Sequence, residues 1–428
     1  MNKRDYLMLL TEQIRNKRAR QSVESEIGSH IDDQISGFMA DGMTRSEAEK
    51  AAIDDMGDPV KTGVSLDIVH KPKMNWSFYG FVLAMSAFSI ILMWILRGSV
   101  YEIGVTMVGI IGMTVVCYVD YTFFCRYVKV ILISFVLLFA MTIWGNGLMV
   151  NGVKAYLWMP FGRSLSLTAL IYLYVPIYAV ILFQNKNGGY KALIKCVAFM
   201  ILPVFLALCM PCISLAMNML LILLLLLSIA IYKKWFCIKR ISSFLILWST
   251  FVILPLITGF ILYFRLGFSN HFISNAERVM HQKQMIQEAV SGPWRSFEAF
   301  TDYYIAYLIE YFGMAVVVLI IAILAFMICK VFQISIHQSN QQGQMIGIGC
   351  GLIFATQTIQ YILMNLNIIP PITAYLPFFS WGGSDKMVSY LLLGLILSIY
   401  RYQSIPDLAG PNEIKFVQRI GEMIHAKK

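Results

Sequence analysis

The sequence predicts an all-α, polytopic integral membrane protein with about ten transmembrane helices, preceded by a small helical domain. Of its 428 residues, 58% are hydrophobic and 14% are charged, which is too apolar for a soluble globular protein. Residues 1–75 carry 11 Lys and Arg against 13 Asp and Glu, whereas the rest of the chain carries 23 against 11. The basic excess of the apolar part indicates membrane topology and lipid contact, and no nucleic-acid surface is predicted.

Residues 1–72 are expected to form a separate cytoplasmic helical domain. Apolar residues recur at helical spacing between Leu7 and Ile35. Thr44-Arg45-Ser46-Glu47 predicts a capping box, and Gly57-Asp58-Pro59 predicts the end of that helix. The pattern resembles the helical prefix domain fused in front of many bacterial permeases. It implies a docking or regulatory module, and a structural cap without a partner is the alternative.

Ten apolar segments follow, each long enough to cross a hydrocarbon core of about 30 Å as a helix. Their expected bounds are 76–96, 101–119, 128–148, 166–184, 192–210, 212–231, 243–264, 303–329, 344–366 and 386–401. With both termini in the cytoplasm, the basic loop residues all lie inside, as the positive-inside rule requires; they are Arg126, Lys129, Lys186, Lys191, Lys195, Lys233, Lys234, Lys239, Arg240 and Lys330. Residues 403–428 are then a basic cytoplasmic tail.

Three outer loops remain in this topology, at 145–165, 265–302 and 367–385, and extracytoplasmic chemistry would have to occur there. The last of them contains Pro370-Pro371-Ile372-Thr373-Ala374-Tyr375-Leu376-Pro377-Phe378-Phe379-Ser380-Trp381-Gly382-Gly383-Ser384. Three prolines and two adjacent glycines cannot continue a helix, so we expect a shaped loop. Its aromatic residues suit a position at the membrane interface, as one wall of an outer cavity.

Two carboxylates stand near the start of the eighth apolar segment. Asp302 lies at its mouth and Glu310 lies inside it, where apolar surroundings disfavour an ionised group. Eight residues along a helix place Glu310 about 12 Å deeper and about 80° around from Asp302. The two cannot flank one bond, which argues against a glycosidase. A transferase with a lipid-diphosphate donor needs one base for the acceptor hydroxyl and cations for the diphosphate, because the leaving group requires no acid.

These motifs resemble the SEDS family of cell-shape, division and sporulation membrane proteins. The family has a Leu-Pro-Phe-x-Ser-aromatic-Gly-Gly-Ser stretch before its last membrane helix, and an aspartate followed about eight residues later by Glu-x-x-Gly. The resemblance spans residues 76–402. It implies a bacterial cytoplasmic-membrane glycosyltransferase that inverts the sugar carbon and polymerises lipid II, an undecaprenyl-diphosphate-linked disaccharide-peptide, on the outer face. It also implies a class B penicillin-binding protein, a transpeptidase, as partner, and a divalent Mg²⁺ or Mn²⁺ ion as a possible cofactor, although no metal-cage spacing is present.

On this resemblance Asp302 is the catalytic residue, with helix capping as its other role. Substrate contacts are expected from Lys154, Arg163, Arg278, Ser380, Gly382, Gly383, Ser384 and Asp385, and support from Glu310, Gly313 and Pro377. Lys386 is a further candidate cation for the diphosphate. The alternative for the basic residues is contact with lipid headgroups. Glu310 is expected to be a buried partner that positions its helix.

The sequence departs from the family in three places. Ser164-Leu165-Ser166-Leu167 stands where most members have Gln-Pro-Ser-Glu and then a lysine. Residues 290–295 replace a Gly-Ser-Gly-rich stretch, and Asp385 follows Gly-Gly-Ser where a small or apolar residue is usual. Asp385 is a candidate substitute for the missing acid. The departures leave two alternatives open, a non-catalytic scaffold or regulator of a transpeptidase and a flippase for the lipid-linked precursor.

Overall fold

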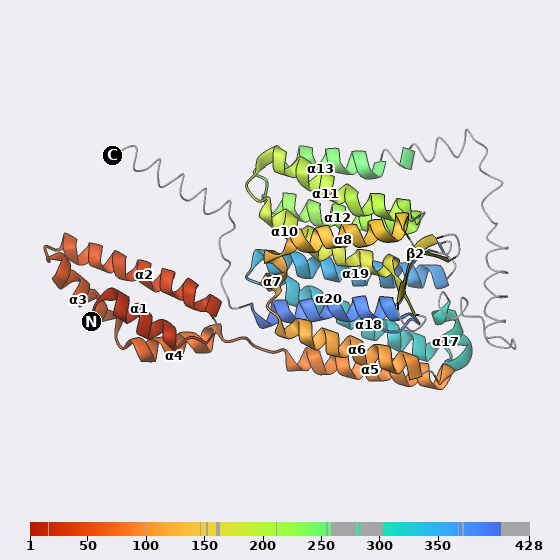
Figure 1. Ribbon diagram of the computed structural model, residues 1–428, viewed down its shortest axis with the longest axis horizontal. Helices are drawn as coiled ribbons and strands as arrows, with labels where there is room; N and C mark the ends of the chain where they lie inside the picture. The colour runs from red at the N-terminus through yellow and green to blue at the C-terminus, as the bar shows by residue number, and fades with distance from the viewer. Residues whose placement is uncertain are drawn as a thin grey trace.

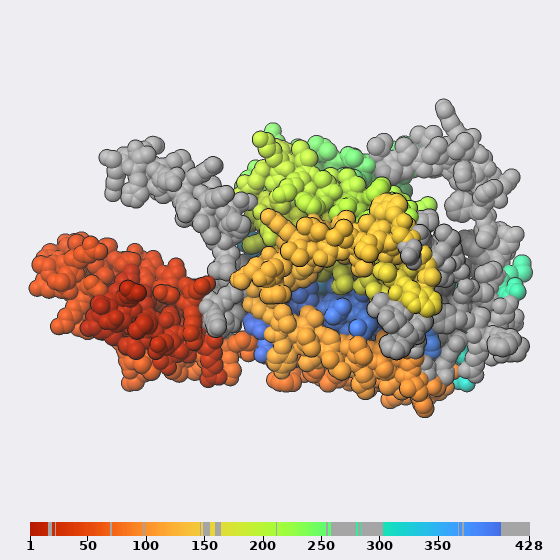
Figure 2. All heavy atoms as spheres, in the orientation of Figure 1, coloured from red at the N-terminus to blue at the C-terminus, as the bar shows by residue number. Residues whose placement is uncertain are grey.

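The computed structural model describes residues 1–15, 17–98, 100–145, 147–150, 153–159, 163–210, 212–253, 256–257, 280, 284, 303–366, 368–369 and 372–403. Within these ranges the chain is mostly helical. A group of four N-terminal helices lies beside a long bundle of roughly parallel and antiparallel helices (Figure 1). In the space-filling view the N-terminal helices adjoin one end of the bundle and do not enter it (Figure 2).

The N-terminal helices are α1 (Lys3–Glu12), α2 (Lys17–Ala40), α3 (Arg45–Met56) and α4 (Pro59–His70). They share an apolar core of their own, made of Tyr6, Leu7, Leu10, Ile14, Ala19, Val23, Ile31, Ala52 and Ile53. The Glu47 carboxylate reaches back to accept from the Thr44 amide at 3.2 Å, as a capping box requires. Asp58 caps α4, with Pro59 at its first position. These contacts explain why a short polar segment folds into four helices.

The bundle contains, in order, α5 (Trp76–Arg97), α6 (Val100–Tyr118), α7 (Tyr121–Arg126), α8 (Val128–Trp144), α9 (Leu167–Leu170), η2 (Ile171–Leu173), α10 (Tyr174–Gln184), α11 (Gly189–Cys209), α12 (Ile213–Tyr232), α13 (Arg240–Trp248), η3 (Ser249–Ile253), α17 (Tyr304–Phe312), α18 (Met314–Ile336), α19 (Gln341–Asn365) and α20 (Gly383–Arg401). Among the described residues, seven helices are long and apolar enough to cross a membrane, with 167–184 counted as one. Two shorter apolar helices, 128–144 and 240–253, and the charged α20 account for the other expected spans. The expectation of an all-α polytopic membrane protein is confirmed.

The expected eighth span is broken, and here the prediction of one continuous helix from 303 is wrong. Gly313 has φ +80°, which ends α17 and starts α18 in a new direction. Only a residue without Cβ adopts this conformation at little cost. The membrane-crossing helix therefore begins at Met314, and the short α17 lies at the end of the bundle (Figure 1).

The segment expected as the first outer loop also differs from expectation, because it contains a small antiparallel sheet. Its strands are β1 (Leu148–Val150), β2 (Val153–Met159) and β3 (Arg163–Ser166), in the order β1-β2-β3. On β2, Ala155 is buried whereas Trp158 is 64% exposed, so the sheet has one face on the bundle and one face open. The alternation is short, which is why the segment was expected to be a loop.

The two ends of the bundle differ in what they carry. The end that joins the N-terminal helices holds the basic turns after α10 and α12, and there the Lys73 amide donates to the Arg401 carbonyl at 3.1 Å. The opposite end holds the sheet, α17 and the segment 372–382 between α19 and α20 (Figure 1). We call this opposite end the site end.

Candidate functional site

The segment Tyr375–Ser380 at the site end is a tight turn packed inside the bundle. Leu376 and Phe379 are fully buried, and the Leu376 carbonyl accepts from the Phe379 amide at 3.2 Å and the Ser380 amide at 3.0 Å. Pro377 precedes Phe378, whose φ is +67°, which is the pattern of a type II turn. Glycine normally takes the position of Phe378. The ring, which packs between Phe354 and Tyr390, holds the turn in this conformation.

Hydrogen bonds from neighbouring helices fix this turn further. Ser89 on α5 donates its hydroxyl to the Phe378 carbonyl at 2.7 Å. The Ser380 hydroxyl donates to the Leu376 carbonyl at 3.0 Å, so in this structure its hydrogen is used within the turn. Gln357 on α19 accepts from the Tyr375 amide at 3.1 Å. The loop is therefore fixed in one conformation rather than a free segment.

A buried polar network lies directly beneath the turn. The Tyr172 hydroxyl accepts from the Asn218 side chain at 2.9 Å and from the Gln357 side chain. Since Gln357 also binds the Tyr375 amide, the network joins three bundle elements to the loop. Buried polar groups are costly unless they are paired, so this network specifies one arrangement of the loop.

The glycines after the turn allow close approach of other elements. A Cβ on Gly383 would lie 2.5 Å from the Tyr101 hydroxyl on α6. A Cβ on Gly382, which has φ +149°, would lie 2.8 Å from the Asp385 carboxylate. Ser384, in the first turn of α20, accepts from the Ser166 amide at 2.9 Å. The structure thus joins the end of β3 to the start of α20, and Gly382 to Asp385 are half-buried there.

Lys386 does not lie open to a ligand as the sequence led us to expect. Its side chain is 1% exposed and forms an ion pair with Glu102 on α6, which is also 1% exposed. The expectation of a free cation at this position is therefore wrong. Glu102 was missed at the sequence level, although a carboxylate inside an apolar segment is itself a signal.

The expected site residues on the earlier outer loops are described only in part. Lys154 lies on β2 opposite Met149, and Arg163 lies on β3 opposite Met159. Their backbones place both residues in the sheet at the site end, and β3 leads to the Ser166–Ser384 contact. Asp302 and Arg278 lie outside the described residues.

The helix that follows Asp302 is held against α19. The Tyr304 amide donates to the Tyr361 hydroxyl at 3.1 Å, and the Ala306 amide donates to the Asn365 side chain at 3.2 Å. These bonds satisfy two amides of the first turn of α17, which a helix leaves without internal partners. Glu310, on the last turn, is exposed, so the expectation of a buried carboxylate is wrong.

The described residues do not fit a divalent cation. They contain no group of three or more His, Cys, Asp or Glu side chains close enough to hold a metal ion. At the site end Glu102 is paired with Lys386, while Asp385 and Glu310 lie on other elements. Mg²⁺ and Mn²⁺ need several converging oxygen ligands, and the described residues of the site end do not supply them.

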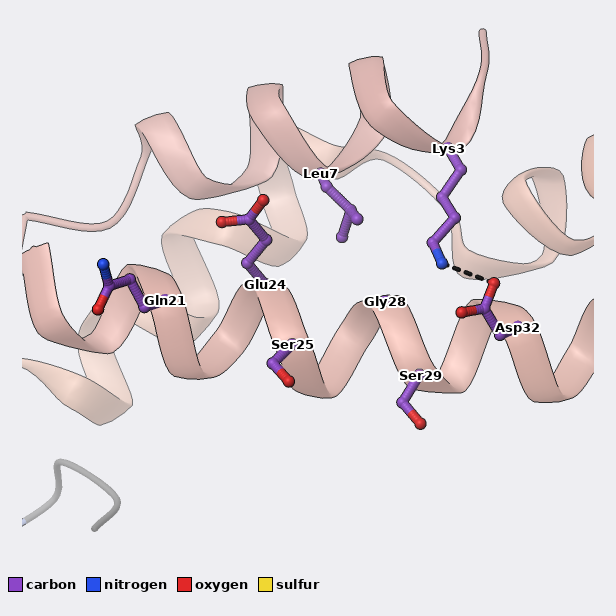
Figure 3. A pocket seen from close by; sticks show the side chains of 8 residues that line it. All are labelled: Lys3, Leu7, Gln21, Glu24, Ser25, Gly28, Ser29 and Asp32. Carbon is purple, nitrogen blue, oxygen red and sulfur yellow. Dashed lines mark hydrogen bonds and ion pairs between the residues drawn. The ribbon is translucent and has the colours of Figure 1, made fainter. Parts of the chain in front are cut away.

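A hollow lies in the N-terminal helices, between α1 and α2. It has a volume of about 470 Å³ and is lined by Lys3, Leu7, Gln21, Glu24, Ser25, Gly28, Ser29 and Asp32 (Figure 3). The Lys3 ammonium bridges it to the Asp32 carboxylate at 2.6 Å. The lining is polar and open, and it offers no arrangement typical of catalysis.

Comparisons with known proteins point to one family. The model of the cell cycle proteins FtsW, RodA and SpoVE matches residues 297–405. A probable peptidoglycan glycosyltransferase FtsW of Enterococcus hirae is 34% identical over 102 residues, which are 24% of this chain and 26% of that protein. A probable peptidoglycan glycosyltransferase FtsW of Thioalkalivibrio sp. is 29% identical over 112 residues, which are 26% of this chain and 28% of that protein. The chain thus matches about a quarter of the length of these relatives.

Solved structures share the fold over a longer stretch. A chain from work on how a peptidoglycan synthase complex coordinates polymerization and crosslinking aligns with a TM-score of 0.61 at 16% identity, over 77% of this chain and 98% of that one. The rod shape determining protein RodA of Thermus thermophilus aligns with a TM-score of 0.56 at 16% identity, over 77% of this chain and 97% of that one. At this identity the likeness establishes the fold of the bundle.

Proposed function

We propose that this chain is a peptidoglycan glycosyltransferase of the family of FtsW, RodA and SpoVE, a proposal supported by the family model over residues 297–405, the FtsW relatives and the shared fold of the bundle. Its substrate would be the undecaprenyl-diphosphate-linked disaccharide-peptide, polymerised on the outer face of a bacterial cytoplasmic membrane. One observation carries the proposal: the preformed turn Tyr375–Ser380, the sheet with Arg163, and the helix that follows Asp302 all lie at one end of the bundle (Figure 1).

The proposed chemistry needs one base and a preformed surface for the substrate. Asp302 removes the proton from the acceptor sugar hydroxyl, whose oxygen attacks the anomeric carbon of the donor with inversion. The bond from that carbon to the diphosphate breaks, and the lipid diphosphate leaves with its electron pair. Lys154, Arg163 and Arg278 supply positive charge for it, since a diphosphate is stabilised by cations and needs no general acid.

The loop contributes position rather than charge. Turn hydrogen bonds and the network beneath it hold Tyr375–Ser380 rigid, and Gly382 and Gly383 let Asp385 and the Tyr101 hydroxyl pack closely against the backbone that follows the turn. Ser384 and Asp385 follow in the first turn of α20, half-buried beside β3. A fixed wall of this kind lowers the entropy lost when a lipid-borne sugar is oriented.

The proposed orientation places the site end outside the cell. At the opposite end the basic turns, the N-terminal helices and the end of α20 gather together (Figure 1). Cytoplasmic loops of membrane proteins carry the excess of Lys and Arg. The partner proposed for this chain is a class B penicillin-binding protein, supported by its likeness to a chain studied within a peptidoglycan synthase complex.

The test is polymerisation by the purified full chain in liposomes supplied with the lipid-linked disaccharide, with and without a transpeptidase. Wild type is expected to make glycan polymer and Asp302→Asn to make none. Asp120→Asn is the matched control, because Asp120 caps α7 at the opposite end and asparagine caps equally well. Equal polymer from wild type and Asp302→Asn would refute the assignment of the base.

A non-catalytic scaffold is the second candidate. It is favoured by the segment Ser164–Leu167, which lacks the acid and the lysine of the family motif. In this segment the Ser166 amide is hydrogen-bonded to Ser384 on α20. This function predicts that Asp302→Asn supports growth of a deletion strain as well as wild type does. A flippase predicts lipid movement without polymer, and a fluorescent-lipid assay separates it from both.

A further inference from the structure

The ion pair between Glu102 and Lys386 lies where α6 and α20 pack closely against each other at the site end. Glu102 is in the first turn of α6 and Lys386 is in the first turn of α20, and each side chain is 1% exposed. On either side of the pair the two helices meet through glycine, at Gly383 against Tyr101 and at Gly109 against Tyr390. Close packing here is thus achieved by small residues.

Close packing of two helices through glycines does not require a buried ion pair between them. Removing two charges from water costs more than an apolar contact of the same size, unless every polar atom is satisfied. Only one Glu102 oxygen contacts the ammonium, while Oε1 is buried and has no hydrogen-bond partner among the described residues. A pair retained at this cost points to a role in the site rather than in stability.

The position of the pair links three elements of the candidate site. Lys386 follows Ser384 and Asp385 directly, so it fixes the helical turn that carries them. The Glu102 carboxylate also lies within electrostatic range of the buried hydroxyl of Tyr304, which begins α17 two residues after Asp302. The Ser166–Ser384 hydrogen bond joins α20 to β3, which α9 follows. Residues 164–170 of β3 and α9 contain no acid and no lysine.

We propose that Glu102 and Lys386 are positioning residues for the reaction at the site end. The pair sets the first turn of α20 against β3 and against the start of α17, so that Ser384 and Asp385 face the same substrate as the helix after Asp302. This role rests on the proposed function. Residues 164–170 contain no acid and no lysine, and we infer that Glu102 on α6 and Lys386 on α20 take the place of such a pair. Neither residue touches the substrate.

The experiment compares the full chain with Lys386→Met, with Glu102→Leu/Lys386→Met, and with the exchange Glu102→Lys/Lys386→Glu. Thermal stability reports folding, hydrogen exchange of the Ser166 amide reports the placement of α20, and polymerisation gives kcat and KM. Tyr390→Phe is the control, because Tyr390 lies on α20 like Lys386 and the substitution removes its buried hydrogen bond to Ser86 on α5 while keeping the ring.

Lys386→Met alone is expected to lose stability, because it leaves a buried charge unpaired. The apolar double variant is expected to fold, to exchange the Ser166 amide faster, and to lose on the order of 10²-fold in kcat with KM little changed, since small misplacements cost that much. The exchanged pair regains part of the rate and of the protection, and Tyr390→Phe resembles wild type in both.

A double variant with wild-type kcat and wild-type Ser166 exchange would overturn the proposal. So would a loss confined to KM, which would make the pair a substrate contact. If wild type itself makes no polymer, the proposed function fails. The hydrogen-exchange rate of the Ser166 amide then decides alone whether the pair positions α20. If the apolar double variant does not fold, kcat and Ser166 amide exchange are compared instead between wild type and Glu102→Lys/Lys386→Glu.

Discussion

A substitution at Gly109 tests the α6–α20 contact most directly. A Cβ at this position would lie 2.3 Å from the Tyr390 ring, whose hydroxyl is hydrogen-bonded to Ser86 at 2.7 Å. In Gly109→Ala the ring must move or the helices must separate. Overpacking of this kind costs about 1–3 kcal/mol, and loss of the hydroxyl bond adds about 1 kcal/mol.

Gly112 on the same helix supplies the matched control. Its Cβ would lie 3.7 Å from Leu391, which is ordinary contact. Both substitutions gain up to about 1 kcal/mol of helix propensity, so their difference isolates the steric cost. We expect Gly109→Ala to be less stable than Gly112→Ala by about 2–4 kcal/mol.

The assay is equilibrium unfolding of the full chain in mixed detergent micelles, followed by tryptophan fluorescence. Tyr390→Phe separates the two contributions, because it removes the hydrogen bond and keeps the ring. Equal stability of the two alanine variants would show that α6 and α20 are not packed as described.

Two further predictions concern the loop network and the N-terminal helices. Tyr172→Phe leaves the buried Asn218 and Gln357 side-chain donors without their acceptor, and we expect a loss of about 2–4 kcal/mol in the same unfolding assay; no loss would mean that water replaces the hydroxyl. Hydrogen bonds from Thr44 hold the pKa of the exposed Glu47 carboxyl below its ordinary value of 4.5, so they stabilise α3 above that pH and are lost as the pH falls through the lowered pKa. Hydrogen exchange of α3 in Thr44→Ala should therefore exceed that of wild type at pH 7, and the gap should narrow as the pH falls through the lowered pKa of Glu47; a constant gap would contradict the cap.

The sequence predicted most of the membrane helices because their signal is local. Apolar length alone places α5, α6, α11 and α12 within three residues of their expected starts. The same holds for the shaped loop, since three prolines and two adjacent glycines within 15 residues cannot continue a helix. Such features depend on residues close in sequence, so no knowledge of the tertiary structure was needed.

The sequence did not predict features that depend on distant residues. Glu102 and Lys386 are 284 residues apart, and neither position alone predicts the other. The break at Gly313 was hidden within a long apolar run, where a single glycine is usually tolerated. The burial of Lys386 and the exposure of Glu310 follow from these two features, so both errors about charged residues have a tertiary cause.

Helix α20 connects the candidate site to the opposite end of the bundle. Its first turn carries Ser384 and Asp385, and its last residue, Arg401, accepts a hydrogen bond from Lys73 in the segment that leads to the N-terminal helices. A rigid helix moves as one body, so a shift that loosens its contact with α6 displaces the site before it unfolds the chain. Gly109→Ala should accordingly lose polymerisation at temperatures where its fluorescence is still that of the folded protein. If activity and folding were lost together, α20 would be a structural helix only.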